Sequence, residues 1–158
     1  MNLGVVTAVR SALPHGRTLP RDAFETRHRV MLAVLCAHLP VLAVVAFAYG
    51  ASPLHALLHP LPVLALLLPA WRLDAPRARA ACAALGLLTC SAVLVHSMHG
   101  LIEAHFHFFI IITVLAVYED WVPFGLALGY VVVHHGVVGV GLPYRVFDHP
   151  GAEEGAEA

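Results

Sequence analysis

Charged residues are scarce in this chain of 158 residues, and lysine is missing altogether. Only 12% of the residues are Asp, Glu, Lys or Arg, whereas about a quarter are charged in an average soluble domain. Apolar residues make up 59% of the chain. Four long segments contain no charged residue: 30–71, 80–102, 104–118 and 121–144. These absences exclude an ordinary soluble domain and predict an integral membrane protein.

Motifs that carry enzyme chemistry are also missing. The sequence has no nucleophile elbow, no phosphate-binding glycine loop and no pair of carboxylates within an apolar segment. The sequence therefore lacks the residues that hydrolase and phosphoryl-transfer mechanisms require. The few cysteines are scattered without metal-ligand spacing, and no large excess of positive charge is present to bind nucleic acid. We expect a protein that is not an enzyme and has no nucleic-acid partner.

The uncharged segments predict about five membrane-spanning helices, because one span needs roughly 20 mainly apolar residues. Segment 30–71 is long enough for two helices, and the turn-forming cluster from Tyr49 to Pro53 divides it. The expected helices are about 30–49, 54–70, 80–98, 104–118 and 123–142. The predicted fold is therefore an all-α, polytopic transmembrane helix bundle.

Arginine placement predicts how this bundle is oriented. Five arginines precede the first helix and three lie in the loop after the second. By the positive-inside rule both regions are cytoplasmic. We therefore divide the chain into a cytoplasmic basic segment (1–29), a transmembrane helical domain (30–143) and a short acidic tail (144–158). The tail is expected to be extracytoplasmic and disordered.

Histidine is the polar residue that the apolar segments do contain. Imidazole is costly to bury in hydrocarbon unless it is hydrogen-bonded or bound to a ligand, so such residues are candidates for a functional site. One buried histidine can be a packing residue, but nine of the twelve lie in these segments. They are His38, His55, His59, His96, His99, His105, His107, His134 and His135.

The predicted topology sorts these histidines into two levels. At about 1.5 Å per residue, His38 lies roughly 13 Å beyond the last arginine before its helix. The expected midplane level, a cofactor site, contains His38, His59, His107, His134 and His135. The expected outer level, a metal site, contains His55, His96, His99, His105 and Glu103.

Helical phase indicates which histidines can cooperate. His55 and His59 are four residues apart and share a face, as do His96 and His99, which are three apart. His105 and His107 are about 200° apart on a helix, so only one of them points to a given centre. Ligand sets rich in imidazole suit copper, iron or zinc, and paired histidines also suit haem. The sequence leaves haem and a transition metal both open.

Three stretches of the sequence resemble a known membrane module. They are Gly-Leu-Ile-Glu-Ala-His-Phe-His-Phe-Phe at 100–109, Tyr-Glu-Asp-Trp-Val-Pro at 118–123 and His-His-Gly at 134–136. Together they are similar to the N-terminal multi-pass sensor module of bacterial methyl-accepting chemotaxis proteins and GGDEF-type diguanylate cyclases. The resemblance covers roughly residues 20–150. It implies a signal-input module in the bacterial cytoplasmic membrane, here without an output domain.

The expected function is thus a membrane-embedded sensory or binding module with a histidine-lined site for haem or a transition metal. Its expected partners are the lipid bilayer and a cytoplasmic or membrane signalling protein or a second copy of the chain. One alternative is a small b-type cytochrome that exchanges electrons with quinone. A second is a proton or metal-ion transporter, although the chain shows no internal inverted repeat.

Overall fold

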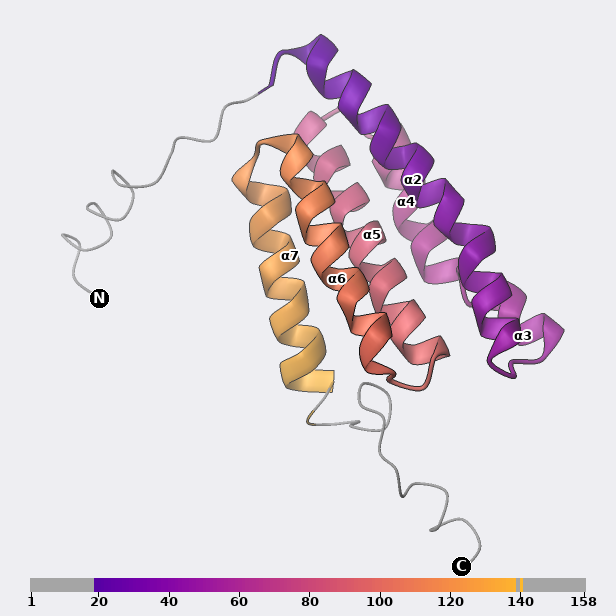
Figure 1. Cartoon of the computed structure of the whole chain (residues 1–158). Coiled ribbons are helices and arrows are strands. Elements are labelled where there is room, and N and C mark those ends of the chain that lie inside the picture. Colours follow the sequence, from indigo (N-terminus) through magenta and orange to yellow (C-terminus); the bar gives the residue numbers. More distant parts are fainter. Residues whose placement is uncertain (1–18, 139, 141–158) are drawn as a thin grey trace, which may run out of the picture.

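The computed structural model describes residues 19–138 and 140, and this part of the chain is helical with no strand (Figure 1). The first helix is α2 (Arg21–Ala48), and the second is divided into α3 (Pro53–Leu58) and α4 (Leu61–Arg72). They are followed by α5 (Pro76–Ser97), then α6 (Ile102–Leu115) with the 3₁₀ turn η1 (Ala116–Tyr118). Last come α7 (Trp121–Val133) and the π-helical turn η2 (His134–Val138). The predicted all-α bundle is confirmed.

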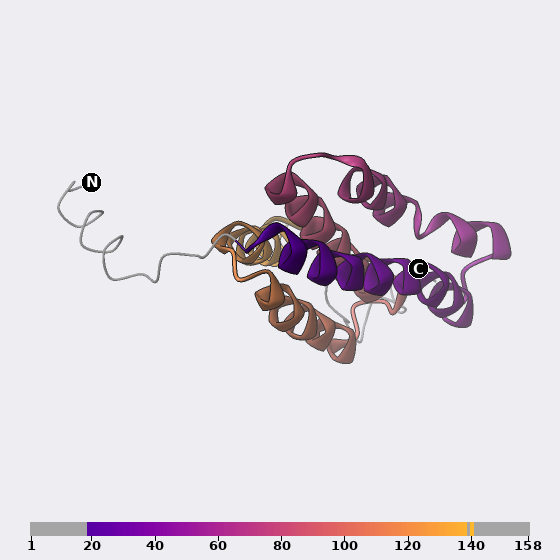
Figure 2. The ribbon, with the colours of Figure 1, turned by 90° about the horizontal axis from the view of Figure 1, so that it is seen from above.

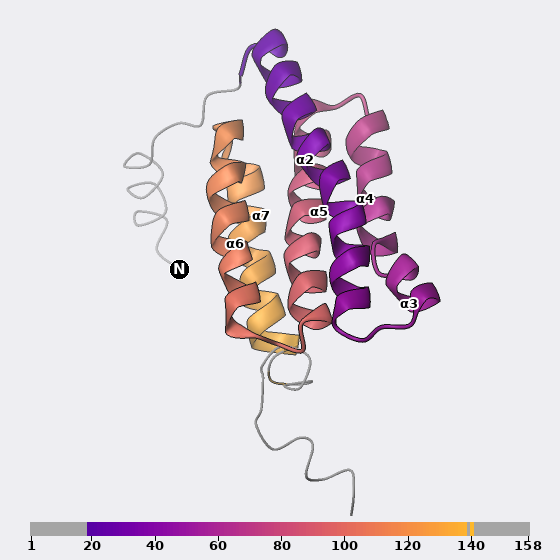
Figure 3. The ribbon, with the colours of Figure 1, turned by 45° about the vertical axis from the view of Figure 1, so that its right-hand side comes forward.

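Helix α5 lies at the centre of the bundle, with α2 and α4 on one side and α6 and α7 on the other (Figure 3). Its contact face is built from small residues such as Ala83, Ala84 and Gly86, which let neighbouring backbones approach closely. A Cβ at Gly86 would lie 3.0 Å from Cδ2 of Leu35 on α2. The glycine therefore sets how closely α5 packs against α2.

Prolines and capping residues set the helix boundaries. Pro60 interrupts the second helix, which breaks between Leu58 and Leu61 rather than running through 54–70. Figure 2 shows α3 set apart from α4 as a result. The last helix begins at Trp121, before the predicted Pro123, because the Asp120 side chain accepts a hydrogen bond of 2.9 Å from the backbone N–H of Val122.

The first helix starts earlier than the apolar segment predicts, at Arg21 instead of residue 30. Its charged first turns are bonded to the rest of the bundle. Arg27 forms an ion pair of 2.6 Å with Glu119, and both guanidinium NH₂ groups of Arg79 donate to the carboxylate of Glu25. These contacts order part of the segment expected to precede the membrane domain. Most of that segment, and the predicted acidic tail, lie outside the described residues.

Three helical units are long and apolar enough to cross a membrane: α2, the combined α3–α4 unit (Pro53–Arg72) and α5. The units Ile102–Tyr118 and Trp121–Val137 are apolar but shorter. Many large apolar side chains face outward from the bundle, among them Val44, Leu54 and Phe109 at 60–70% exposure. An outer surface of this kind is suited to lipid contact.

Candidate functional site

One histidine pair with a direct contact between ring nitrogens joins the first and fourth predicted helices. His38 of α2 and His107 of α6 are both half-buried, and their Nε2 atoms lie 3.1 Å apart. Nδ1 of His38 is 2.7 Å from the carbonyl oxygen of Val34, one turn earlier on α2. Nδ1 of His107 is 2.8 Å from Oγ of Ser91, a buried residue of the central helix α5. Side chains from three helices thus meet at one point.

The partners of this pair determine which nitrogen carries each proton when both rings are neutral. A carbonyl only accepts, so Nδ1–H of His38 donates to Val34 and its Nε2 is an acceptor. Nε2–H of His107 therefore donates to His38, and Nδ1 of His107 accepts from the Ser91 hydroxyl. The Ser91 Oγ also lies 3.4 Å from the carbonyl oxygen of Leu87, which offers its proton a second acceptor.

The geometry of the pair is also suited to binding an ion. Two nitrogens bound to one ion at about 2.0–2.1 Å lie about 2.9–3.4 Å apart when they occupy neighbouring coordination positions. The observed Nε2 separation in His38 and His107 is 3.1 Å. Both remaining ring nitrogens have polar partners, as is usual for histidines that bind metals. Within residues 19–138, however, no three His, Cys, Asp or Glu side chains form a ready metal site.

A second group of histidines lines a groove at the opposite end of the bundle from the arginines. Cavities of about 340 and 220 Å³ share His55, His59 and His96 in their walls, and His99 borders the smaller one. The ring centroids of His55 and His59 are 4.9 Å apart, and those of His59 and His96 are 6.0 Å apart. His99 has a left-handed backbone conformation, with φ +54°. Its Nε2–H donates a hydrogen bond to the carbonyl oxygen of Tyr49.

A third group lies between α6 and η2, the turn that follows α7. The ring of His105 is 5.3 Å from that of His135, between centroids, and Phe108 packs against both His134 and His135. The ring of His134 also stacks on Tyr130 at 6.3 Å. The buried Nδ1 of His134 has no hydrogen-bond partner among the described residues.

The structure therefore distributes the predicted midplane residues over three groups. His38 and His107 meet, whereas His59 lies in the outer groove and His134 and His135 lie with His105. The predicted contact between His55 and His59, four residues apart, is observed. His105 and His107 point to different neighbours, as predicted: His105 contacts His135 and His107 contacts His38. Glu103 is exposed in the first turn of α6. Whether any of these residues binds a cofactor stays a prediction.

One buried histidine lies outside the predicted levels. His28 of α2 has no exposed surface. Its Nε2–H donates to the carbonyl of Ala70 at 2.9 Å, so its Nδ1 accepts from the Tyr118 hydroxyl at 2.7 Å. The ring of Phe24 stacks on it with centroids 5.2 Å apart. His28 thus connects α2 with α4 and η1. Its place between two arginines in the sequence gives no sign of this burial.

These features define an apolar, all-helical domain associated with a membrane, with histidine contacts between its helices. The chain is similar to Transducer protein Htr8 of Halobacterium salinarum, with 36% identity over an alignment length of 165. The alignment covers 94% of this chain and 26% of the transducer, so the chain spans about a quarter of that relative. No protein-family model matches the chain, and no solved structure matches it. The similarity agrees with the predicted relation to chemotaxis transducers; the relation to diguanylate cyclases stays a prediction.

Proposed function

We propose that this chain is the membrane-embedded signal-input module of a transducer system, and that His38 and His107 form its sensing site by holding a transition metal ion. The observation that carries the proposal is the contact between their Nε2 atoms, 3.1 Å apart across α2 and α6. The similarity to a transducer over 94% of the chain supports the sensory part. The expected multi-pass placement, with a cytoplasmic N-terminus, belongs to the same proposal.

Residues around the pair can adapt to an ion without breaking the surrounding hydrogen bonds. For both Nε2 atoms to face the ion, the proton of His107 must move from Nε2 to Nδ1, where it is donated to Ser91 Oγ. The Ser91 hydroxyl then donates to Leu87, whose oxygen is 3.4 Å away. His38 needs no change, because Val34 already holds its proton on Nδ1. The bound metal would supply Lewis-acid or redox sensitivity.

We favour a metal ion over haem for this pair. A haem held by both histidines would need room for its porphyrin between the two rings. In the structure the two rings contact each other directly, with centroids 5.2 Å apart and planes at 65°. Haem could enter only after α2 moved away from α6, and the same requirement applies to the b-type cytochrome alternative.

An ion bound by His38 and His107 would change the positions of the helices relative to one another. His38, Ser91 and His107 belong to α2, α5 and α6, so replacing one hydrogen bond by two coordination bonds changes contacts between three helices. A signal is transmitted when a ligand favours one of two helix arrangements over the other. The partner that receives the signal would be a signalling protein in the membrane or cytoplasm, or a second copy of the chain.

The absorption spectrum and metal content of the detergent-purified full chain test the proposal. Protein from cells supplied with copper, iron and zinc is expected to carry about one equivalent of one of these metals and to show no porphyrin absorption. A strong porphyrin band would assign the site to haem instead. A colourless, metal-free preparation that also fails to take up added Cu²⁺ or Zn²⁺ would overturn the proposed function.

A further inference from the structure

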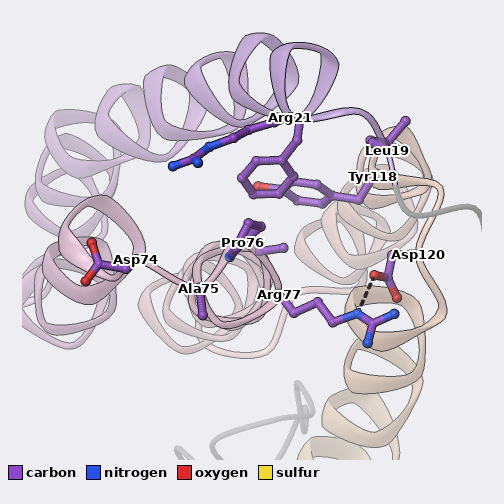
Figure 4. Close-up of a pocket in the computed structure, with 10 residues that line it drawn as sticks. Leu19, Arg21, Asp74, Ala75, Pro76, Arg77, Tyr118 and Asp120 are labelled. Atoms are coloured by element: carbon purple, nitrogen blue, oxygen red, sulfur yellow. Dashed lines mark hydrogen bonds and ion pairs between the residues drawn. The ribbon is translucent and has the colours of Figure 1, made fainter.

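A cavity of about 470 Å³ lies at the arginine-rich end of the bundle, and neither His38 nor His107 lines it. Its volume is in the range of about 300–1,000 Å³ that is typical of small-molecule sites. Figure 4 shows the residues of its walls. The walls come from the start of α2, the loop between α4 and α5, and the segment around η1. Leu19, Phe24, Pro76 and Tyr118 make one part of this wall apolar or aromatic.

Charged groups of both signs border the same cavity. Arg77 and Asp120 neutralise each other through an ion pair of 3.4 Å. Arg21 and Asp74 also border it, and both side chains are exposed. Within the part of the chain that the structure describes neither forms a hydrogen bond or salt bridge, and Arg21 also attracts the nearby Glu25 carboxyl through its charge. Figure 4 shows these two on the same side of the cavity, opposite the Arg77–Asp120 pair. The cavity is thus bordered by one cation and one anion that no salt bridge neutralises within the described residues.

Two exposed tryptophans near this cavity are of the kind found at the boundary between lipid and water. Trp71 lies three residues before Asp74, and Trp121 directly follows Asp120. Their exposed fractions are 65% and 46%. Exposed tryptophans and arginines at the end of a membrane bundle mark the headgroup level of a bilayer. A ligand that reaches this cavity would therefore come from the interface.

We propose that the cavity binds the headgroup of a zwitterionic phospholipid. The Arg21 guanidinium contacts its phosphate, the Asp74 carboxylate contacts its ammonium group, and the aromatic wall contacts the glycerol and the first acyl carbons. An anionic headgroup alone would be repelled by Asp74, which is why a zwitterion fits better. Because Phe24 and Tyr118 also contact His28, the lipid would adjoin the contact between α2 and η1.

Native mass spectrometry of the full chain in detergent tests this assignment. The probes are dioctanoyl phosphatidylethanolamine, dioctanoyl phosphatidylglycerol and free phosphoethanolamine. The wild-type chain is expected to bind one phosphatidylethanolamine, and to prefer it over phosphatidylglycerol. Arg21→Gln should weaken that binding about tenfold or more, since hydrogen bonds to charged groups are worth this much. Asp74→Asn should remove the preference between the two lipids.

The exposed Arg72, at the same end but outside the cavity wall, supplies the control. Arg72→Gln should bind both lipids as the wild-type chain does. Equal binding of the two lipids by the wild-type chain would show only bulk lipid contact and overturn the proposal, whatever the variants do. Free phosphoethanolamine binding as tightly as the lipid would assign the cavity to a water-soluble ligand. Unchanged binding by Arg21→Gln and Asp74→Asn would also contradict the proposal.

Discussion

His38 and His107 are 69 positions apart in the sequence, yet their Nε2 atoms lie 3.1 Å from each other in the bundle. Each is held by its other ring nitrogen, one by a backbone carbonyl and one by a serine hydroxyl. Each of the two rings is therefore held in a fixed orientation by a group outside the contact. Two imidazoles arranged in this way form a link between α2 and α6 that a ligand can replace.

A substitution can distinguish whether Ser91 orients His107 or only packs within the bundle. Ser91→Ala removes the group that orients His107, so we expect metal affinity to fall about 10- to 100-fold, the usual effect of losing such a partner. Ser97→Ala is the matched control, because Ser97 is also a buried serine of α5 but donates only to the carbonyl of Val93. Titration with Cu²⁺ or Zn²⁺ by calorimetry measures both. Equal losses in the two variants would argue against the orienting role.

The buried contact of His28 should contribute to stability. Tyr118→Phe leaves Nδ1 of His28 without its donor inside the bundle, which we expect to cost about 1–3 kcal/mol in the free energy of unfolding. The control is Tyr49→Phe, since Tyr49 is 40% exposed and water can satisfy its hydroxyl. Denaturant titration in detergent micelles, followed by circular dichroism, compares the two. A Tyr118→Phe variant as stable as Tyr49→Phe would show that the bond contributes little.

Close packing at Gly86 provides a test of the helix arrangement. Gly86→Leu places a large side chain where even a Cβ would meet Leu35 at 3.0 Å. We expect it to destabilise the bundle by about 1–3 kcal/mol, the usual cost of overpacking. Gly129→Leu on α7 is the control, because a Cβ there meets nothing within 4 Å. If both variants unfold at the same denaturant concentration, α5 does not pack against α2 as described.

The helices could be predicted from the sequence because they depend on local properties. The uncharged segments and the turn-forming cluster from Tyr49 to Pro53 mark them directly. Pairs on one helix, such as His55 with His59, follow from helical phase in the same way. Boundaries were less accurate where tertiary contacts extend a helix, as at Arg21, or where an N-cap begins one, as at Asp120.

The grouping of the histidines could not be predicted in full, because the sequence indicates how deep each residue lies along its helix but not where that helix lies across the bundle. His59 and His38 were expected at similar depths, but His59 packs against His96 on α5 while His38 meets α6. The order of neighbouring helices and their rotation depend on packing, for example at Gly86. Ser91 and His28 were missed for the same reason, since their partners are distant in sequence.

The metal content of the purified full chain in three forms tests directly whether His38 and His107 hold a metal ion. Wild-type protein and His149→Ala, whose substitution lies outside the described residues, are expected to retain about one equivalent of metal per chain. His107→Ala is expected to lose most of it, because only one histidine of the pair remains. Equal retention by His107→Ala and His149→Ala would contradict the assignment of the sensing site to His38 and His107.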